Sequence, residues 1–598
     1  MAKNQYATPS APVSFVQLGG GLNSTSGPLG LQENESTDLQ NIDFDKFGSI
    51  LQRNGYTALN TSAITNTPNS DGLYWYVYDD GTGTTIEKLI NVTDGKLYKM
   101  DALDGTWDNV TETQAVVFTG SGLDDGTSSG TYTGNGDIEY KVVIDLAAAT
   151  DTFEWFKDNV SQASGVSITG AAQLLDNGLS ITFVATTGHT LNDQWVFHPA
   201  TVITADNHCD FETYINTVLI TNNVNPPFQW DGTGNSALMT VPPGLTKARA
   251  VSQFQNYTFL ANVLVSGVAY PSRFYWSEIR TIDSWDAADW IEVAKEDGQE
   301  ITAIKVLGDR LIVYKERSIH VVAFTGDRTT PFLVYKTNSP VGCIAPFSIQ
   351  ELDNGHIFLT YDGIYFFDGN NSFKVSDRIT TTLLGLNRTK LDEAVSLYQR
   401  DKNRYWLSVA SSGSGTNDTI IVWDAANNAF SKYNGINASG MADVIKDKVE
   451  ERPYFADYLG FVYRGDTGID DYPSNSVTAI DSYYATNWKN FVDVVNQKRI
   501  PHIYTYYEIA NTVLTLSYAY DFDTGEERSL TIDLSTSGDV YNTAVYGDSE
   551  YSVSGGRVTR NDLTGRGRVI RFKYSNNIVG ETWQVDGFGV QGGLETNF

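Results

Sequence analysis

Cysteine and histidine are scarce in this 598-residue chain, which holds 2 cysteines and 6 histidines. Neither Cys209 nor Cys343 belongs to a CxxC pair, and no histidine stands at zinc-ligand spacing from a cysteine or from another histidine. These absences exclude a disulfide framework and a zinc cluster as sources of stability. We expect two buried or half-buried thiols, no metal site and no cofactor.

Long apolar stretches are also missing. No run reaches the ~18 residues that a membrane-spanning helix needs, and the first residues, Met1 to Tyr6, are polar. The sequence therefore predicts neither a spanning helix nor a signal peptide, and we expect a soluble chain that is made in the cytoplasm.

Basic charge is in short supply as well. The chain has 41 lysine and arginine residues against 72 aspartate and glutamate residues, a formal net charge of −31. Binding nucleic acid by neutralising its phosphates requires a basic surface, so the composition disfavours this class of function. Solubility alone explains the acidity equally well.

The motifs of common enzymes are absent too. The sequence has no GxSxG nucleophile motif, no GxxxxGK phosphate loop and no GxGxxG between a strand and a helix. Some propellers are glycosidases with paired carboxylates near their axis. The acidic pairs of this chain lie in turn-like sequence, where we expect solvated side chains: Asp79-Asp80, Asp124-Asp125 and Asp470-Asp471. We predict no catalytic residue and no enzyme activity.

Aromatic residues, by contrast, make up 12% of the chain, and 53 residues are glycine, a combination typical of short strands joined by tight turns. Seven aromatic or apolar stretches run into a turn, at residues 100, 230, 276, 324, 367, 423 and 463. The intervals are 130, 46, 48, 43, 56 and 40 residues, and all but the first match one four-stranded sheet per repeat. We predict an all-β fold with a six- or seven-bladed β-propeller.

The long first interval predicts an inserted domain. Its alternating strands indicate a small β-sandwich with a core of Phe153, Trp155, Phe183, Trp195 and Phe197. The expected domains are an extended N-terminal arm (1–34), the first part of the propeller (35–120), the inserted β-sandwich (121–200), the remainder of the propeller (201–475) and a C-terminal β-sandwich (476–598). We expect a hairpin at about 39–55 to close the propeller onto its last blade.

One segment near the C-terminus is basic in this acidic protein. Its members are Arg557, Arg560, Arg566, Arg568, Arg571 and Lys573. Such a segment suits contact with an acidic neighbouring subunit or with DNA phosphates, and a solvated strand face explains it as well. These six residues are the candidate inter-subunit or DNA-path contacts.

Several stretches resemble a known family. They are residues 276–293, 297–304, 309–322 and 361–369, with the opening 29–45 and the closing 567–576 and 583–589. These aromatic and turn-rich patterns resemble the β-propeller nozzle or hub proteins (tail tubular protein B-like) in the tails of short-tailed bacteriophages. The inserted block resembles a β-sandwich module of other phage tail proteins.

The resemblance implies a virion protein of the phage tail, made in the host cytoplasm. It implies a ring of six copies around the path of the ejected DNA, which passes without specific binding. The implied partners are tail adaptor ring proteins, tail fibres or spikes, and contact with the host cell surface. Two other functions remain open on the residues alone: a propeller glycosidase or lyase, or a carbohydrate-binding adhesin acting on a surface polysaccharide. An exposed shelf of Trp155 or Trp195 favours the adhesin, and we expect both side chains to be buried.

Overall fold

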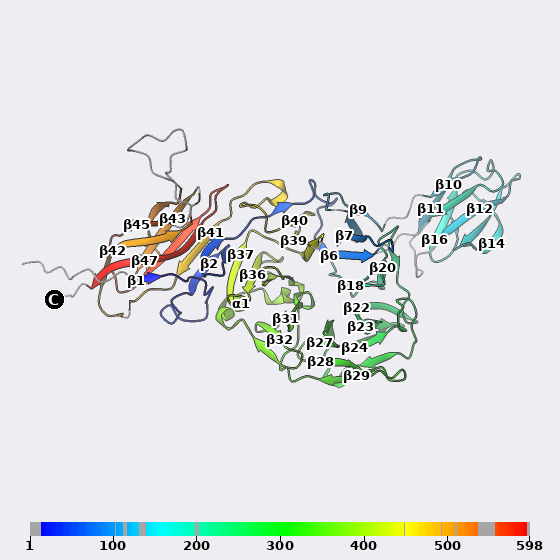
Figure 1. Cartoon of the computed structure of the whole chain (residues 1–598). Coiled ribbons are helices and arrows are strands. Elements are labelled where there is room, and N and C mark those ends of the chain that lie inside the picture. Colours follow the sequence, from blue (N-terminus) through cyan, green and yellow to red (C-terminus); the bar gives the residue numbers. More distant parts are fainter. Residues whose placement is uncertain are drawn as a thin grey trace, which may run out of the picture. The chain divides into compact units, whose positions relative to one another are not determined.

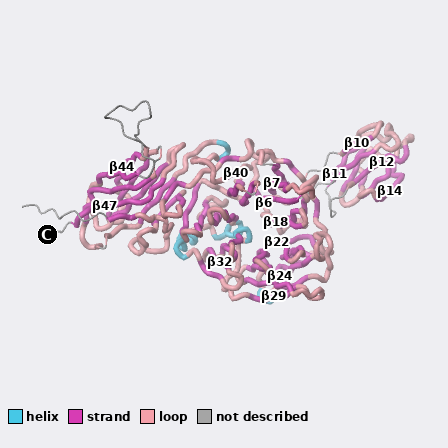
Figure 2. The backbone as a smooth tube through the Cα atoms, viewed as in Figure 1, coloured by secondary structure: helices cyan, strands magenta, loops and turns pink. Residues whose placement is uncertain are grey.

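The computed structural model describes residues 13–594 except 80, 102, 112–115, 131–138, 198–202, 448, 492, 509, 511 and 536–556. Strands dominate this part of the chain (Figure 2). Its helical elements are α1 (Thr380–Leu384) and the 3₁₀ turns η1 (Lys295–Asp297), η2 (Pro346–Ser348), η3 (Asp377–Ile379), η4 (Arg388–Glu393) and η5 (Pro473–Asn475). The chain forms two compact units, one of Met1–Ala63, Phe347–Phe366 and Phe373–Phe598, the other of Ile64–Pro346 and Phe367–Ser372.

Seven four-stranded sheets recur along the described residues (Figure 1). Four begin in the second unit: β6 (Ser70–Asp79), β7 (Thr85–Thr93), β8 (Lys96–Asp101), β9 (Asp108–Asn109); β18 (Asp210–Tyr214), β19 (Thr217–Thr221), β20 (Phe228–Trp230), β21 (Ala237–Leu238); β22 (Leu245–Phe254), β23 (Tyr257–Val265), β24 (Val268–Trp276), β25 (Trp290–Glu292); and β26 (Ile301–Leu307), β27 (Arg310–Lys315), β28 (Ile319–Phe324), β29 (Phe332–Lys336).

Three further sheets begin in the first unit: β30 (Gln350–Leu352), β31 (Gly355–Leu359), β32 (Ile364–Phe367), β33 (Ser372–Lys374); β34 (Val395–Gln399), β35 (Arg404–Val409), β36 (Thr419–Asp424), β37 (Ala429–Asn434); and β38 (Gly440–Lys446), β39 (Glu450–Ala456), β40 (Val462–Arg464), β5 (Thr57–Ala58). The seven stretches that run into a turn in the sequence end at residues 100, 230, 276, 324, 367, 423 and 463. Each of these residues lies in the third strand of one of the seven sheets: β8, β20, β24, β28, β32, β36 and β40. The spacing thus identified one four-stranded sheet per repeat, and the number of blades in a closed ring stays a prediction.

Within each unit, consecutive sheets pack on one another through their first and second strands. In the second unit, Thr221 Oγ1 donates to the carbonyl of Arg249 at 3.1 Å, and Arg249 forms an ion pair with Glu300 at 2.6 Å. In the first unit, Gln350 donates to the carbonyl of Ser396 at 2.9 Å. The regular succession of small sheets is propeller-like.

The last sheet in chain order takes its outer strand from the N-terminal region. Ala58 and Thr57 of β5 pair antiparallel with Tyr463 and Arg464 of β40. The hairpin expected at 39–55 does form, but it is not the closing element. Its strands β3 (Ile42–Phe44) and β4 (Ile50–Gln52) join a different sheet, because Ile50 of β4 pairs with Val585 near the C-terminus.

We call the pair of sheets that contains this hairpin the terminal domain. One sheet has the order β3, β4, β47 (Gln584–Leu594), β42 (Lys498–Tyr507) and β45 (Arg557–Asp562), with β1 (Val13–Phe15) also on β47; the other has the order β2 (Ser36–Gln40), β41 (Ser482–Thr486), β46 (Ile570–Asn576), β43 (Val513–Tyr520) and β44 (Arg528–Asp533). Alternate residues of β46 are buried, as expected of a strand with one face on a core. Phe572 and Tyr574 pack on Phe588 of the facing sheet, with ring centroids 5.3 and 6.3 Å away. The N-terminal strands thus belong to the C-terminal sheets, where we expected an arm to residue 34 and propeller from residue 35.

The inserted block lies between β9 and β18, and its two sheets share one hydrophobic core. The sheets are β10 (Val117–Thr119), β17 (Gln194–Phe197), β12 (Tyr140–Leu146), β13 (Thr152–Lys157), β14 (Val160–Ser167), and β11 (Gly126–Gly130), β16 (Leu179–Phe183), β15 (Gln173–Leu174). All five core residues expected from the sequence are buried: Phe153, Trp155, Phe183, Trp195 and Phe197. The prediction that both tryptophans are buried is therefore confirmed.

Candidate assembly surface of the terminal domain

A buried arginine joins the N-terminal strands to the first unit's last sheets. Arg53 follows β4 and forms a two-pronged ion pair with Asp471, at 2.8 and 2.6 Å. It also donates to Asn41 Oδ1 at 2.9 Å and to the carbonyl of Asn434 at 3.1 Å. Burial opposes the charge of Arg53, but the Asp471 carboxylate outweighs it and raises the pKa of Arg53 above its usual value. All five N–H donors of the guanidinium are thus committed inside the protein.

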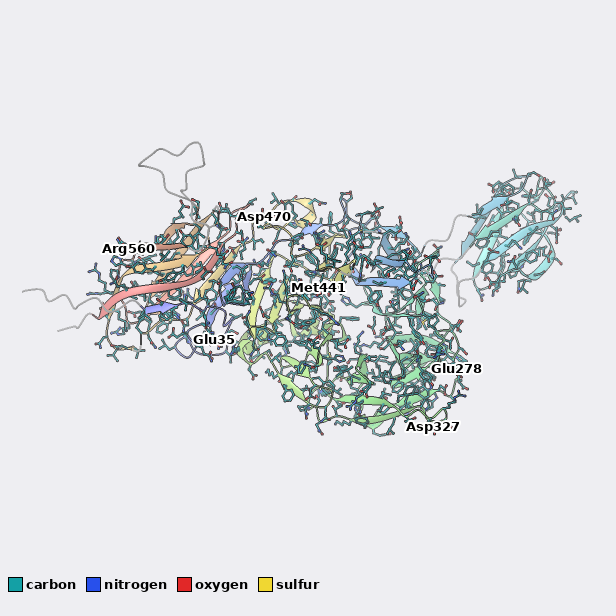
Figure 3. All side chains as sticks on the ribbon, in the orientation of Figure 1. Glu35, Glu278, Asp327, Met441, Asp470 and Arg560 are labelled. Carbon is teal, nitrogen blue, oxygen red and sulfur yellow. The ribbon has the colours of Figure 1, made fainter. Side chains whose placement is uncertain are left out.

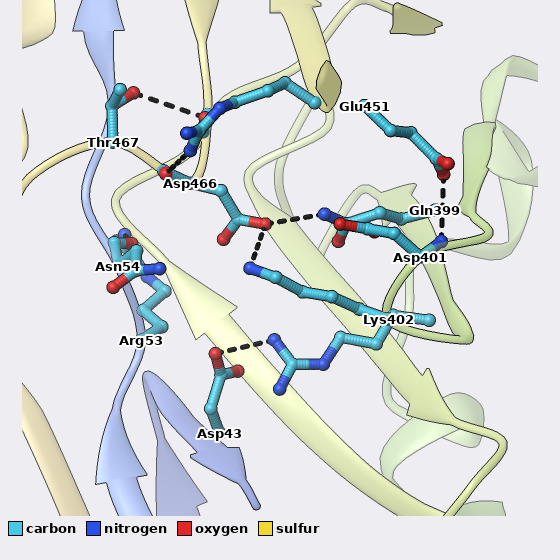
Figure 4. A network of polar contacts seen from close by, with 12 residues as sticks. Asp43, Arg53, Asn54, Gln399, Asp401, Lys402, Glu451, Asp466 and Thr467 are labelled. Carbon is cyan, nitrogen blue, oxygen red and sulfur yellow. Dashed lines mark hydrogen bonds and ion pairs between the residues drawn. The ribbon is translucent and has the colours of Figure 1, made fainter. Parts of the chain in front are cut away.

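A second group of buried charges lies beside it (Figure 4). Arg404 of β35 donates to Asp43 of β3 at 2.7 Å, and Asp466 accepts from Gln399 and Lys402 at 2.8 and 2.7 Å. Burial works against the charged form of Arg404, yet Asp43 holds its pKa well above the usual range. The terminal domain is therefore tied to the sheet of β34 to β37 by paired charges rather than by apolar packing alone.

One of the acidic pairs expected to be solvated, Asp470-Asp471, is instead buried inside the fold. Asp471 forms the ion pair with Arg53, and its neighbour Asp470, which is labelled in Figure 3, accepts a hydrogen bond from the backbone N–H of Gly580. In the inserted block, Asp125 contacts His189 Nε2 at 2.8 Å, and Asp124 accepts from an indole N–H at 3.2 Å. The expectation was wrong for Asp470, Asp471 and the half-buried Asp125, because their partners stand far away in sequence, whereas Asp124 is exposed as expected. Of the remaining pair, Asp79 is exposed and residue 80 lies outside the described residues.

A cluster of carboxyls lies between β34 and β38. Burial, with the charge of Glu451 next, raises the pKa of Asp443 to about 8. Glu451 also accepts from the backbone N–H of Arg400 and of Asp401, and burial raises the pKa of Asp401. Asp443 is thus protonated at neutral pH and able to donate a hydrogen bond to Glu451.

Neither a metal centre nor a spanning helix is found in the described part of the chain. No group of three or more histidine, cysteine, aspartate and glutamate side chains there is arranged to hold a metal ion. None of its helices is long and apolar enough to cross a membrane. Both cysteines are buried and free, as expected.

The six basic residues predicted as contacts occupy two strands and the turn between them. Arg560 is exposed on the edge strand β45 (Figure 3), 3.7 Å from Asp562. Arg571 forms an ion pair with Glu527 at 2.6 Å, and Lys573 lies 4.2 Å from the centre of the Tyr483 ring. Both are on β46 and are half-buried, so they are committed within their own sheet. Arg557 begins β45, and its side chain lies outside the described residues.

The other two basic residues, Arg566 and Arg568, are exposed on the turn between β45 and β46. The backbone of Gly567 between them exchanges hydrogen bonds with Lys498, at 2.8 and 3.2 Å. Arg568 donates its backbone N–H to Asp521 at 2.6 Å and its Nε–H to the carbonyl of Val495 at 3.2 Å. We call Arg566, Arg568, Val494 and Val495 the basic turn. It presents charge beside exposed apolar side chains, because Val494 is 47% and Val495 74% exposed.

A cleft of about 560 Å³ opens on the same domain, and no motif in the sequence pointed to it. We call it the acidic groove; its lining residues are Val16, Asp45, Phe47, Ser49, Tyr506, Glu508, Val558, Gln584 and Asp586. Phe47 is 69% exposed, and the Asp45 carboxylate fixes its turn by accepting from the backbone N–H groups of Phe47 and Ser49, both at 2.8 Å. In the part of the chain that is described, no lysine or arginine forms an ion pair with Asp45, Glu508 or Asp586. The Asp45–Gly48 turn, which carries Phe47, was visible in the sequence, but the groove is assembled from five separate segments of the chain.

Comparison with known proteins gives a family match for part of the chain. Residues 184–410, less than half of the chain, match the model of a family described as "Bacteriophage P22 Gp10, beta-propeller". No curated protein matches. The crystal structure of BamB from Moraxella catarrhalis aligns at 12% identity with a TM-score of 0.28, over 59% of this chain and 97% of that one. The family match supports a bacteriophage β-propeller protein and suggests a structural component of the virion.

Proposed function

We propose that this protein is a structural component of a bacteriophage tail, and that six copies form the nozzle or hub ring through which DNA leaves the particle. The observation that carries the proposal is the match of residues 184–410 to a phage β-propeller family. The succession of four-stranded sheets and the strand β5 that completes the last of them support it, since both are typical of propellers. Ring contacts, an adaptor ring above and fibres or spikes outside are part of the same proposal.

The role proposed is that of a conduit without catalysis. A net charge of −31 per copy favours a channel wall that repels phosphates, so that DNA slides through without binding. The alternative of a carbohydrate-binding adhesin required an exposed aromatic shelf, and it is disfavoured because Trp155 and Trp195 are buried. The host cell surface remains a proposed contact of the assembled tail rather than of an aromatic shelf.

Electron microscopy of the purified full-length chain tests the proposal, together with mass measurement in solution. We expect closed rings of six copies with a central channel, and an acidic channel wall once the ring is resolved. A monomer, or a ring whose channel wall is basic, contradicts the proposal. Release of sugars from host polysaccharide by the purified chain favours the glycosidase or lyase instead.

A further inference from the structure

The acidic groove and the basic turn lie at opposite ends of one strand. β42 runs from Lys498, whose backbone bonds the basic turn at Gly567, to Tyr506 and Tyr507 beside the groove. Ten residues at about 3.3 Å each place the two surfaces roughly 30 Å apart. Within one copy, the basic turn therefore cannot fill the groove of its own domain.

The two surfaces are complementary in charge. The groove carries Asp45, Glu508 and Asp586, and the turn carries Arg566 and Arg568. Opposite charge across an interface speeds encounter and fixes the register of the partners. Arginine suits this role, because its planar guanidinium pairs with a carboxylate through two hydrogen bonds.

The surfaces also match in apolar character. Phe47 at 69% and Val558 at 54% exposure line the groove, whereas Val494 and Val495 protrude beside the arginines. Because the Asp45 carboxylate already fixes the backbone of Phe47, burial of this side chain restricts only its own torsions. Clustered exposed apolar side chains with a polar rim mark interaction surfaces.

We infer that the basic turn of one copy docks in the acidic groove of the next copy. Contact between two different patches is head-to-tail, and it generates a closed ring when the rotation between copies closes. The inference rests on the proposed ring and adds which surfaces form it. It assigns Arg566 and Arg568 to the inter-subunit contact, and it leaves Arg571 and Lys573 to hold their own sheet.

Charge reversal in the full-length chain tests this contact. One variant carries Arg566→Glu and Arg568→Glu, a second carries Glu508→Arg and Asp586→Arg, and a control carries Arg310→Glu and Arg328→Glu at exposed positions of the second unit. We expect each of the first two variants to associate at least about tenfold more weakly than wild type in sedimentation experiments, because like charges then face one another. The control is expected to assemble as wild type does.

Mixing the first two variants in equal amounts is the decisive step. Every junction of an alternating ring then joins opposite charges, so rings are expected to return. If wild type forms rings and either reversal leaves them unchanged, or if the mixture of folded variants stays dissociated, this inference is overturned while the proposed function stands. If wild type remains a monomer, both fail. Circular dichroism melting shows which variants are folded.

Discussion

Removing the side chain of Arg53 tests whether paired charges hold the terminal domain to its neighbouring sheets. In Arg53→Ala, the Asp471 carboxylate stays buried with a side-chain exposure of only 6% but without its partner. Breaking a buried ion pair in this way costs about 3–5 kcal/mol. For a domain of a few hundred residues, this loss of unfolding free energy lowers the melting temperature by on the order of 10 °C.

A double variant separates the pair from the rest of the network. Arg53→Met with Asp471→Leu removes both charges and keeps most of the volume, so it is expected to recover about half of the loss. Recovery is partial because Asn41 and the carbonyl of Asn434 still lose a donor. With the single variants Arg53→Met and Asp471→Leu completing the cycle, the coupling energy of the two sites is expected to be at least about 2 kcal/mol.

Calorimetry of the full chain, with hydrogen exchange of peptides from residues 36–58, measures these effects. The matched control is Arg310→Ala, whose pair with Asp309 is exposed at 45% and 89% and is expected to change stability by less than about 1 kcal/mol. If Arg53→Ala melts no earlier than Arg310→Ala, the buried pair does not hold this junction. If the double variant is no more stable than Arg53→Ala, the loss does not come from the unpaired carboxylate.

Three further predictions concern other parts of the chain. Trp195→Ala empties the centre of the inserted core and should cost about 3–5 kcal/mol, seen as faster hydrogen exchange of residues 140–197; unchanged exchange there would contradict it. In Gly55→Ala, the added Cβ overlaps the carbonyl oxygen of Asp470, so a lower melting temperature is expected, and an unchanged one shows that the backbone yields without cost. Burial raises the pKa of Asp443 to about 8, so its protonated carboxyl stabilises the fold fully below pH 4, and this stabilisation is lost as the pH rises to about 8. Asp443→Asn should therefore make the melting temperature depend less on pH over this range. A slope equal to that of wild type would refute the assignment.

The repeating part of this fold follows from local sequence patterns. The stretch that ends at Trp276 and the stretch that ends at Trp423 each form the third strand of a four-stranded sheet, because alternation and turn residues act over a few positions. The core of the inserted block was predicted for the same reason. Pairing between distant segments was not, since nothing near Ile50 indicates that its partner is Val585.

In the candidate site, too, the features set by local sequence could be predicted and those set by long-range pairing could not. Arg566 and Arg568 could be selected from the sequence, because a basic stretch is conspicuous in an acidic chain. The acidic groove could not be selected, since Phe47, Tyr506 and Asp586 meet only after long-range pairing of β4, β42 and β47. The burial of Asp471 was missed because Arg53 stands 418 positions earlier in the chain.

The N-terminal strands determine when this protein can complete its fold. β2 and β4 pair with strands after residue 481, and β5 pairs with β40, about 400 residues downstream. Contacts so far apart in sequence form slowly, because the loop-closure entropy comes before the contact that compensates it. The acidic groove contains residues from both ends of the chain, so it exists only in a finished copy. The head-to-tail contact that we infer at this groove therefore requires copies in which these distant segments have already paired.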